Sequence, residues 1–383
     1  MSWQVPLTDL SISEPDIEAV LDCLRSGWLT MGPRTEEFER AFAAYVGAPH
    51  AVAVSSGSAA LQLALLAAGI GPGDEVLIPA LTFVATAEAV LQVGAEPVLC
   101  DIAGAPDLNV DVEDLKARLT PRTRAIVLVH FMGYVGPWGP LRQLCDEHDL
   151  VLIEDAAQAI GAWAIPADPD AGVAGQRVGT VGELGCFSLF SKGQLCVGEG
   201  GMVVSADEAL AARVRSLRSH AMTSGTWDRH RGHAESYDVT EVGFNFRLDE
   251  SRAALGLSRL GRVDDDIEHR RALARRYREH LRDVPGIALT WSEEAVQTGS
   301  HFAFAVLSPD REQRDRLRVG LAQAGIQTTF YPALSNFSGY HAYGHHERAG
   351  QASACHSALP LHAGLSAEDQ DAVIAAVCEA AAG

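Results

Sequence analysis

The sequence predicts an α/β protein with a large domain, built on a mostly parallel, doubly wound sheet, and a smaller C-terminal α+β domain. Between residues 50 and 155, short apolar runs alternate with helical patterns, which is typical of parallel βαβ units. The apolar runs are continuous, as expected for strands that helices cover on both faces. We expect the large domain to span residues 1–255 and the small domain to span residues 256–383.

The alternating region defines the expected elements of the large domain. The predicted strands are His50–Val54, Glu75–Pro79, Pro97–Asp101, Ala125–His130, Val151–Asp155, Cys186–Phe190 and Gly201–Ser205. The predicted helices are Glu14–Arg25, Thr35–Tyr45, Ala59–Ala68, Thr82–Gln92, Val112–Leu119, Leu141–His148 and Glu208–Arg218.

The C-terminal part has a different pattern. The polar stretch Thr223–Ser236 contains Gly and His and is predicted to be a loop. Arg252–Arg282 is rich in Arg and Leu and is predicted to be one long helix that links the domains. The expected elements of the small domain are strand His301–Leu307, helix Arg311–Ala324, strand Gln327–Tyr331 and helix Ala367–Ala381.

Composition excludes several classes of function. The formal net charge of −20 argues against binding to nucleic acid or to anionic membranes. No apolar run reaches the roughly 18 residues of a membrane span, and the N-terminus lacks the pattern of a secretion signal, so we expect a cytoplasmic protein. The 7 cysteines are scattered without a CxxC pair, which favours free buried thiols.

Lysine is rare in this chain, and its two occurrences differ in surroundings. Lys116 lies among charges in a helical pattern and is expected to be solvated. Lys192 follows the apolar run Phe187–Phe190 and precedes the glycine-rich Gly198–Gly201. Apolar surroundings lower the pKa of an amine and leave it neutral, which suits Schiff-base formation.

Polar residues follow two of the predicted strands at their carboxyl ends, where open parallel sheets bind ligands. Ser56-Gly57-Ser58 opens a helix and is suited to holding an anion, although an ordinary N-cap turn explains the same residues. Glu154-Asp155 ends a strand and is suited to pairing with a protonated pyridine nitrogen, with a capping carboxylate as the alternative. A magnesium role is weak, because no GxxxxGKS or GxxxxGKT motif occurs.

An anion cradle, a strand-end acid and a sheltered lysine are together the contacts that pyridoxal 5'-phosphate needs. In this combination the chain resembles the DegT/DnrJ/EryC1/StrS family of sugar aminotransferases, within the aspartate-aminotransferase-like fold type I. The likeness covers nearly the whole chain, in the segments SGWLTMGP (26–33), SGSAAL (56–61), GDEVLIPALTFVAT (73–86), IEDAAQAIGA (153–162), FSLFSK (187–192), EGGM (199–202), GFNFRLDE (243–250) and LPLHAGLS (359–366).

The resemblance implies a role for each matching residue. Lys192 would form the Schiff base and move the proton, and Asp155 would pair with the pyridine nitrogen. Gln158 would lie near the phenolic oxygen of the ring, and Phe83 would stack on the ring. Lysine rather than histidine at position 192 favours transamination over the dehydration of a related subgroup.

The resemblance also implies where the cofactor phosphate binds. Gly57, Ser58 and Ser188 would hold it, and Asn245 would reach it from the neighbouring subunit of a homodimer with shared active sites. Ser188 precedes the lysine by four residues where the family usually has five, so Ser191 is an alternative to it.

The same resemblance implies L-glutamate as the amino donor and a nucleotide-linked keto-deoxysugar as the acceptor. SGWLTMGP is closer to relatives that aminate C4 than to those that aminate C3, and it favours a dTDP-4-keto-6-deoxyhexose. Arg229 and Arg231 are candidates for contacts with the sugar nucleotide's diphosphate, or they lie in a solvated loop. Tyr331 and His301 are candidates for the pocket wall, or they are packing residues.

Other functions remain open from the sequence. A C3 sugar aminotransferase, an inosose or aminohydroxybenzoate enzyme of the same family, and a non-catalytic regulator that binds pyridoxal phosphate are the alternatives. A metal enzyme that uses His341, His345 and His346 is weaker, because matching carboxylate or thiolate ligands are missing from that stretch. We therefore expect no metal.

Overall fold

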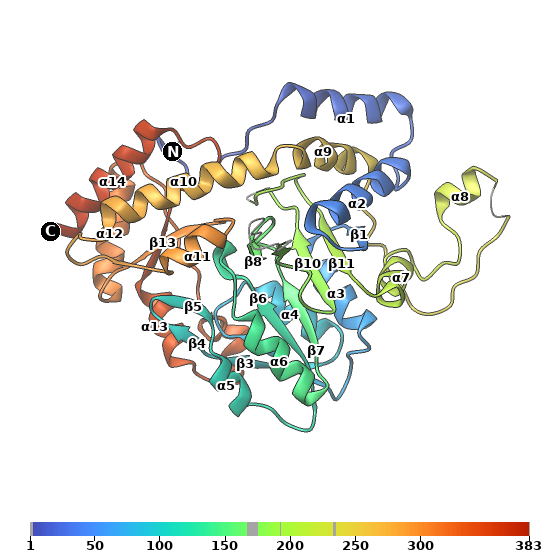
Figure 1. Ribbon diagram of the computed structural model, residues 1–383, viewed down its shortest axis with the longest axis horizontal. Coiled ribbons are helices and arrows are strands. Elements are labelled where there is room, and N and C mark those ends of the chain that lie inside the picture. Colours follow the sequence, from blue (N-terminus) through green and yellow to red (C-terminus); the bar gives the residue numbers. More distant parts are fainter. Residues whose placement is uncertain (1–2, 167–174, 192, 233–234, 383) are drawn as a thin grey trace.

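The computed structural model describes residues 3–166, 175–191, 193–232 and 235–382. Within these residues the central sheet has seven strands in the order β1-β11-β10-β7-β6-β2-β3, and only β11 runs against the others. The strands are β1 (His50–Val54), β2 (Glu75–Pro79), β3 (Glu96–Cys100), β6 (Thr123–Val129), β7 (Val151–Asp155), β10 (Leu184–Ser188) and β11 (Gly201–Ser205). The predicted mostly parallel α/β fold is therefore confirmed (Figure 1).

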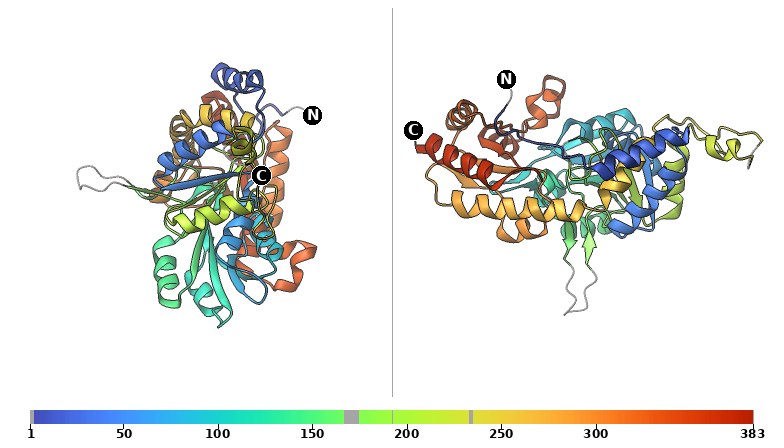
Figure 2. Two further views of the ribbon diagram at one scale, coloured as in Figure 1. Left: turned by 90° about the vertical axis from the view of Figure 1, so that its right-hand side faces the viewer. Right: turned by 90° about the horizontal axis from the view of Figure 1, so that it is seen from above.

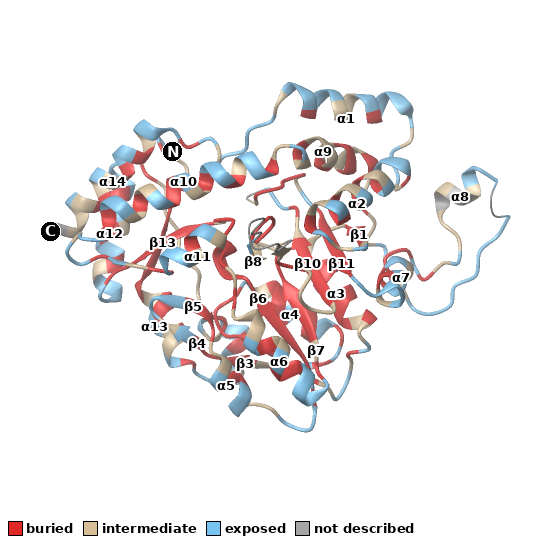
Figure 3. Cartoon of the chain, viewed as in Figure 1, coloured by how far each residue is buried: buried red, intermediate tan, exposed pale blue. Residues whose placement is uncertain are grey.

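Helices cover both faces of this sheet. Alternate residues of each strand point to opposite faces, so Val52 and Val54 pack with α3 on one side while Ala51 and Ala53 pack with α2 on the other. The helices of the large part are α1 (Glu14–Ser26), α2 (Pro33–Val46), α3 (Gly57–Ala67), α4 (Val84–Gln92), α5 (Val112–Ala117), α6 (Trp138–His148), α7 (Glu208–Leu217) and α8 (Thr226–His230). Figure 3 shows the central strands as buried and the outer face of α1 as exposed.

The C-terminal part packs beside the β3 and β6 half of the molecule (Figure 1). Its antiparallel sheet, among the residues described, has the order β12-β13-β14. Its strands are β12 (Ala288–Leu289), β13 (Phe304–Leu307) and β14 (His356–Leu359). Helix α9 (Glu250–Leu260) lies beside α1 and α2 of the large part. The helices of the C-terminal part are α10 (Val263–Leu281), α11 (Glu293–Thr298), α12 (Arg311–Gln323), α13 (Glu347–Cys355) and α14 (Ala367–Ala382), with 3₁₀ turns η2 (Leu334–Asn336) and η3 (Ser338–Tyr343).

Short elements complete the described chain. Strand β4 (Ile102–Gly104) pairs with β5 (Asp107–Val110), and β8 (Trp163–Ile165) pairs with β9 (Gln176–Arg177). A 3₁₀ turn, η1 (Phe131–Gly133), follows β6. The β8–β9 ribbon projects from the body in Figure 2, and α8 lies on an extended arm at the opposite end from the C-terminus in Figure 1.

The predicted single helix Arg252–Arg282 is wrong. The chain leaves α9 at Gly261 and enters α10 after Arg262, whose φ of −125° is not helical. The break allows α9 to pack against α1 and α2, while α10 packs against α14. The predicted domain boundary between residues 255 and 256 falls within α9, and the division into domains stays a prediction.

The other differences have local causes. Gln327–Tyr331 is not a strand, because Gln327 donates its N–H to Val5 and Tyr331 donates its N–H to the ring of His356 at 2.8 Å. The strand predicted from His301 begins only at Phe304, since His301 has a φ of +53°. The predicted loop Thr223–Ser236 contains the short helix α8.

No helix in the described part of the chain combines the length and the apolarity that crossing a bilayer requires. All seven cysteines are free, and six of them are buried.

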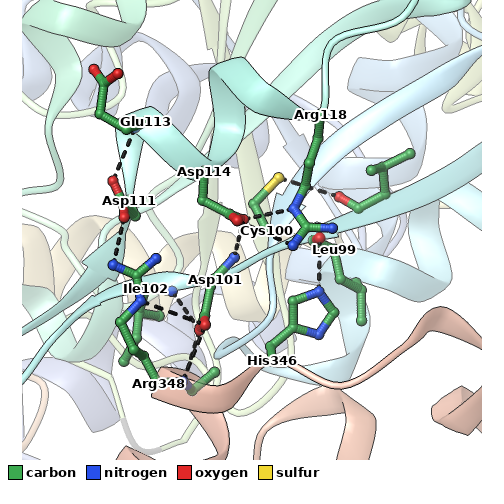
Figure 4. Close-up of polar contacts among 12 residues, drawn as sticks. Leu99, Cys100, Asp101, Ile102, Asp111, Glu113, Asp114, Arg118, His346 and Arg348 are labelled. Carbon is green, nitrogen blue, oxygen red and sulfur yellow. Dashed lines mark hydrogen bonds and ion pairs between the residues drawn. The ribbon is translucent and has the colours of Figure 1, made fainter.

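The carboxylate of Asp101 joins the C-terminal part to the edge of the central sheet (Figure 4). It follows β3 and accepts the backbone N–H groups of Arg348 at 3.1 Å and Ala349 at 2.8 Å, at the start of α13. It also accepts the N–H of Ile102. One negative charge thus satisfies donors of a helix N-terminus that has no side-chain cap of its own.

We expect Asp101→Ala to lower the free energy of unfolding by about 3 kcal/mol, because buried N–H groups lose their acceptor. Urea denaturation of the variant measures this loss. The control is Asp310→Ala, which removes an exposed cap from α12 and should cost only about 1 kcal/mol. Equal losses in the two variants would show that Asp101 is an ordinary helix cap.

Candidate active site

A cavity of about 420 Å³ opens at the carboxyl ends of β7 and β10, beside the first turns of α3 and α4. Parallel strands end at the same edge of the sheet, so residues far apart in sequence meet there. The cavity is lined by both polar and apolar groups, and its polar lining includes Ser56, Ser58, Thr82, Asp155, Gln158 and Ser188.

The two acids that end β7 have different surroundings, because successive strand residues point to opposite faces. Asp155 lines the cavity and is only 6% exposed. Its Oδ2 accepts the hydroxyl of Thr86 at 2.8 Å, and its Oδ1 accepts the N–H of Ala157 at 3.2 Å. Burial raises the pKa of Asp155, and these two hydrogen bonds oppose that rise.

Glu154 instead points into the protein interior. It accepts backbone N–H groups from residues 179, 181 and 182 at 2.7–2.8 Å, and His130 Nε2 lies 3.0 Å from it. Burial alone would raise the pKa of Glu154, but the bonds from His130 and the backbone lower it overall. Glu154 therefore orders the 179–182 turn and is fully engaged there.

No group of three or more His, Cys, Asp or Glu side chains in the described chain is suited to holding a metal ion. His341 and His345 are exposed, while His346 is buried with Nε2 2.9 Å from the carbonyl oxygen of Leu99. The three histidines are therefore not gathered around one point.

The first turn of α3 meets the end of β10 at the cavity. Ser56 is the N-cap of α3, since its hydroxyl accepts the N–H of Ala59 at 3.1 Å. The next residues, Gly57 and Ser58, line the cavity together with Ser188. A Cβ on Gly57 would come within 2.9 Å of the Ser188 Cβ, so only glycine permits this approach. The N-cap of α3 and the residues predicted to hold an anion are thus parts of one turn.

Phe83 and Gln158 are on the same cavity wall as the acid. Phe83, directly before α4, is 64% exposed although it is a large apolar side chain. Gln158 is fixed by the N–H of Met132, which its Oε1 accepts at 2.7 Å. An open aromatic face beside a polar cavity is suited to stacking on a flat ring.

Lys192 lies outside the described residues. Phe190 and Gly193 on either side of it line the cavity. Ser188 at the end of β10 pairs with Gly201 at the start of antiparallel β11, so the segment between them begins and ends at the cavity edge.

Lys116, by contrast, is exposed and pairs with Glu113 at 2.8 Å on α5. The hydrogen bond to Glu113 raises the pKa of Lys116, which keeps this amine charged. A charged amine is a poor nucleophile for Schiff-base formation.

The predicted site residues Asn245, Arg229 and Arg231 do not line this cavity. Asn245 is exposed on the segment that follows the arm. Arg229 donates to the carbonyl of Ser224 at 2.6 Å, and Arg231 lies 5.8 Å from the ring of Trp227. Asn245 nevertheless lies near the end of β1, since the carbonyl oxygen of the next residue, Phe246, accepts the N–H of Ser55 at 2.8 Å. The roles of Asn245, Arg229 and Arg231 stay predictions.

The last two candidates for the pocket wall, Tyr331 and His301, differ in whether they reach the cavity. Tyr331 lines the cavity and stacks on His356 with ring centroids 6.0 Å apart, and burial raises the pKa of its hydroxyl to about 12. His301 is completely buried, with Nε2 2.8 Å from the carbonyl oxygen of Val296, and burial lowers its pKa to about 3. His301 is thus a packing residue, and its neighbour Phe302 lines the cavity instead.

The sequence did not reveal several residues of the site. Thr86 contacts Asp155, and Leu7, Thr8 and Leu361 form a wall contributed by the two ends of the chain. The spacing of Thr82 and Thr86, four residues apart at a helix start, was the only available signal for the threonine contact.

We expect Gly57→Ala to weaken binding of pyridoxal phosphate at least tenfold, because the added methyl displaces Ser188 from the cradle. Titration of the protein with the cofactor, followed by absorbance, measures the affinity. Gly139→Ala is the control, since a Cβ at that early position of α6 meets nothing within 4 Å. Unchanged affinity in Gly57→Ala would remove Gly57 from the phosphate site.

Comparison with known proteins gives relatives that match along the whole chain. The profile of the DegT/DnrJ/EryC1/StrS aminotransferase family matches residues 10–378. GDP-perosamine synthase from Caulobacter vibrioides is 36% identical over 384 residues, which cover 97% of this chain and 98% of that protein.

Solved structures agree in fold. DesV from S. venezuelae is 34% identical, with a TM-score of 0.88 over 100% of this chain and 99% of that chain. The PLP form of the putative sugar aminotransferase Spr1654 from Streptococcus pneumoniae is 26% identical, with a TM-score of 0.89 over 99% of this chain and 98% of that chain. Fold type I and the cofactor pyridoxal phosphate are thereby confirmed. The chain belongs to the DegT/DnrJ/EryC1/StrS family of pyridoxal-phosphate-dependent sugar aminotransferases.

Proposed function

We propose that this aminotransferase transfers an amino group from L-glutamate to a nucleotide-linked keto-deoxysugar. The observation that carries the proposal is the meeting of Asp155, the first turn of α3 and the exposed ring of Phe83 around one cavity. The residues fit pyridoxal phosphate, since the cradle at Gly57 has no room for a side chain and Asp155 has acceptor sites to spare.

When bound, the cofactor supplies an electron-withdrawing pyridine ring that eases removal of a proton from the substrate carbon. Asp155 accepts a hydrogen bond from the ring nitrogen and holds the proton there, a role supported by its place on the cavity wall. Phe83 covers one face of the ring, and Gln158 lies beside the phenolic oxygen. The bond from Met132 to Gln158 supports this role because it fixes the amide.

We assign the proton transfer to the amine of Lys192. This assignment is supported by Phe190 and Gly193, which lie close to residue 192 in the sequence and line the cavity. Gly57, Ser58 and Ser188 hold the phosphate of the cofactor. Hydrogen bonds from a helix N-terminus and hydroxyl groups suit a phosphate dianion.

We further propose a homodimer in which Asn245 of each protomer reaches the cofactor phosphate of the other. The exposure of Asn245 supports this arrangement, as does that of nearby apolar side chains: Val242 is 87% exposed and Val239 is 52% exposed. Apolar side chains this exposed are expected to be covered in an assembly.

The proposed acceptor is a dTDP-4-keto-6-deoxyhexose, aminated at C4 in the cytoplasm. The segment SGWLTMGP supports amination at C4, and similarity to a GDP-perosamine synthase supports a nucleotide-linked sugar. Arg229 and Arg231 of the arm are proposed to bind the diphosphate, because guanidinium groups pair well with phosphate oxygens. Tyr331 on the cavity wall is proposed to contact the sugar.

We expect borohydride reduction of the reconstituted protein to attach the cofactor to Lys192, as located by peptide mapping. Lys192→Ala should abolish this adduct, because it removes the amine proposed to form the Schiff base. Lys116→Ala is the matched control and should leave it intact, since Lys116 is exposed and paired with Glu113. An adduct that persists in Lys192→Ala would contradict the assignment.

We expect the purified protein, given L-glutamate and a panel of keto sugars linked to dTDP, UDP or GDP, to form an amino sugar. Mass spectrometry and NMR of the product identify the sugar and the aminated carbon. Amination at C4 of a dTDP-linked sugar is the expected result. Turnover of an inosose alongside failure of every nucleotide sugar would overturn the proposed substrate.

A further inference from the structure

A chain of hydrogen bonds leads from the cavity wall to the carboxylate of Asp155. The hydroxyl oxygen of Thr82, which lines the cavity, lies 2.9 Å from that of Thr86. Thr86 in turn donates its hydroxyl proton to Asp155 Oδ2 at 2.8 Å. Both threonines are buried, with Thr82 3% exposed and Thr86 1% exposed. These hydroxyls are therefore shielded from the water that would otherwise compete for them.

The direction of the protons along this chain is fixed. Each threonine hydroxyl has a single proton to donate. Since Thr86 donates to Asp155, Thr82 must be the donor to Thr86. All the donated protons thus point towards Asp155, which acts only as an acceptor. This polarity stabilises the ionised carboxylate, and hydrogen bonds in series strengthen one another.

The contacts leave Asp155 able to accept further donors. Its two oxygens offer about four acceptor sites. Thr86 and the N–H of Ala157 use one site each. Burial raises the pKa of Asp155, and the hydrogen bonds from Thr86 and Ala157 are the first two effects that oppose this rise, with a further electrostatic contribution from His130. A further N–H donor from the cavity can therefore bind to a carboxylate that is already oriented.

The start of α4 explains why threonine is suited to this task. Thr82 and Thr86 are four residues apart and lie on one side of the turn, while Phe83 of the same turn is exposed to the cavity. A threonine side chain has only two favoured rotamers in a helix, and the contacts with Thr82 and Asp155 hold the Thr86 hydroxyl in one position.

We propose that Thr86 is a positioning residue that orients the Asp155 carboxylate for the pyridine nitrogen and keeps it ionised, with Thr82 holding Thr86 in place. Thr86 does not line the cavity and acts only through Asp155. The inference rests on the role of Asp155 given under the proposed function.

The test is Thr86→Val, which replaces the hydroxyl by a methyl of similar size. We expect the affinity of the apoenzyme for pyridoxal phosphate to fall roughly ten- to hundredfold, the usual effect of removing a hydrogen bond to a charged group. Absorbance titrations with the cofactor between about pH 5.5 and pH 9 measure it.

The pH dependence separates this role from a merely structural one. Without the hydroxyl, the pKa of Asp155 rises further, so its carboxyl group stays neutral up to a higher pH. The difference in affinity between the variant and the wild type should be largest at low pH and shrink as pH rises. Thr86→Ser keeps the hydroxyl and should restore most of the affinity and the wild-type pH dependence.

Thr290→Val is the matched control. Thr290 is equally buried and donates its hydroxyl to the carbonyl oxygen of Ala305 at 2.9 Å, but it does not line the cavity. This variant should lose a similar amount of stability in urea denaturation while its affinity for the cofactor stays that of the wild type. If Thr86→Val fails to fold, Thr82→Val replaces it. We expect Thr82→Val to lose less affinity for the cofactor, and we expect this loss also to be largest at low pH.

The outcomes distinguish this inference from the proposed function. Suppose that the wild type forms an adduct at Lys192, but that Thr86→Val (or Thr82→Val in its place) binds the cofactor with the affinity and pH dependence of the wild type. In that case the positioning role is overturned and the proposed function stands. If the wild type itself binds no cofactor at Lys192, the proposed function fails. A loss of affinity in Thr86→Val that is the same at every pH would also overturn the role.

Discussion

The buried carboxylate of Asp155 is the constraint on which the rest of the site depends. A negative charge at the end of a central strand is costly unless donors surround it, and here they come from the start of α4 and from the turn after β7. Strand alternation separates this acid from Glu154, which is engaged by the 179–182 turn. Sheet geometry therefore decides which of two adjacent acids faces the cavity.

The parallel direction of the strands brings the other groups to the same place. β1, β2, β7 and β10 all end at one edge, and residues at or after these ends supply the proposed phosphate cradle, the exposed ring of Phe83 and the carboxylate of Asp155. The reversal of β11 has its own consequence, because the chain leaves β10 at that edge and returns to it after residue 200. The order and direction of the strands, more than any single contact, therefore determine where the cavity forms.

The sequence predicted the parts that depend on local pattern. β1, β2, β7 and β11 match their predicted bounds, because each contains an uninterrupted run of three or more apolar residues. Prediction from the sequence failed where contacts between residues far apart in the chain determine the local structure. Gln327 pairs with Val5, more than 300 residues away, and Thr86 finds its acceptor 69 residues further along. The interruption at Gly261 was hidden because the helical pattern continues through it.

The cavity has two walls of different origin, and this has a consequence for how the enzyme can change. The sheet edge carries the groups proposed to hold the cofactor, while Leu7, Tyr331 and Leu361 come from the ends of the chain. We expect mutations in the second wall to change the shape of the space and to leave the carboxylate of Asp155 in place, because its hydrogen bonds come from Thr86 and Ala157. Such a division allows the enzyme to gain new amino-acceptor substrates, in evolution or by selection in the laboratory, while the residues proposed to hold the cofactor stay unchanged.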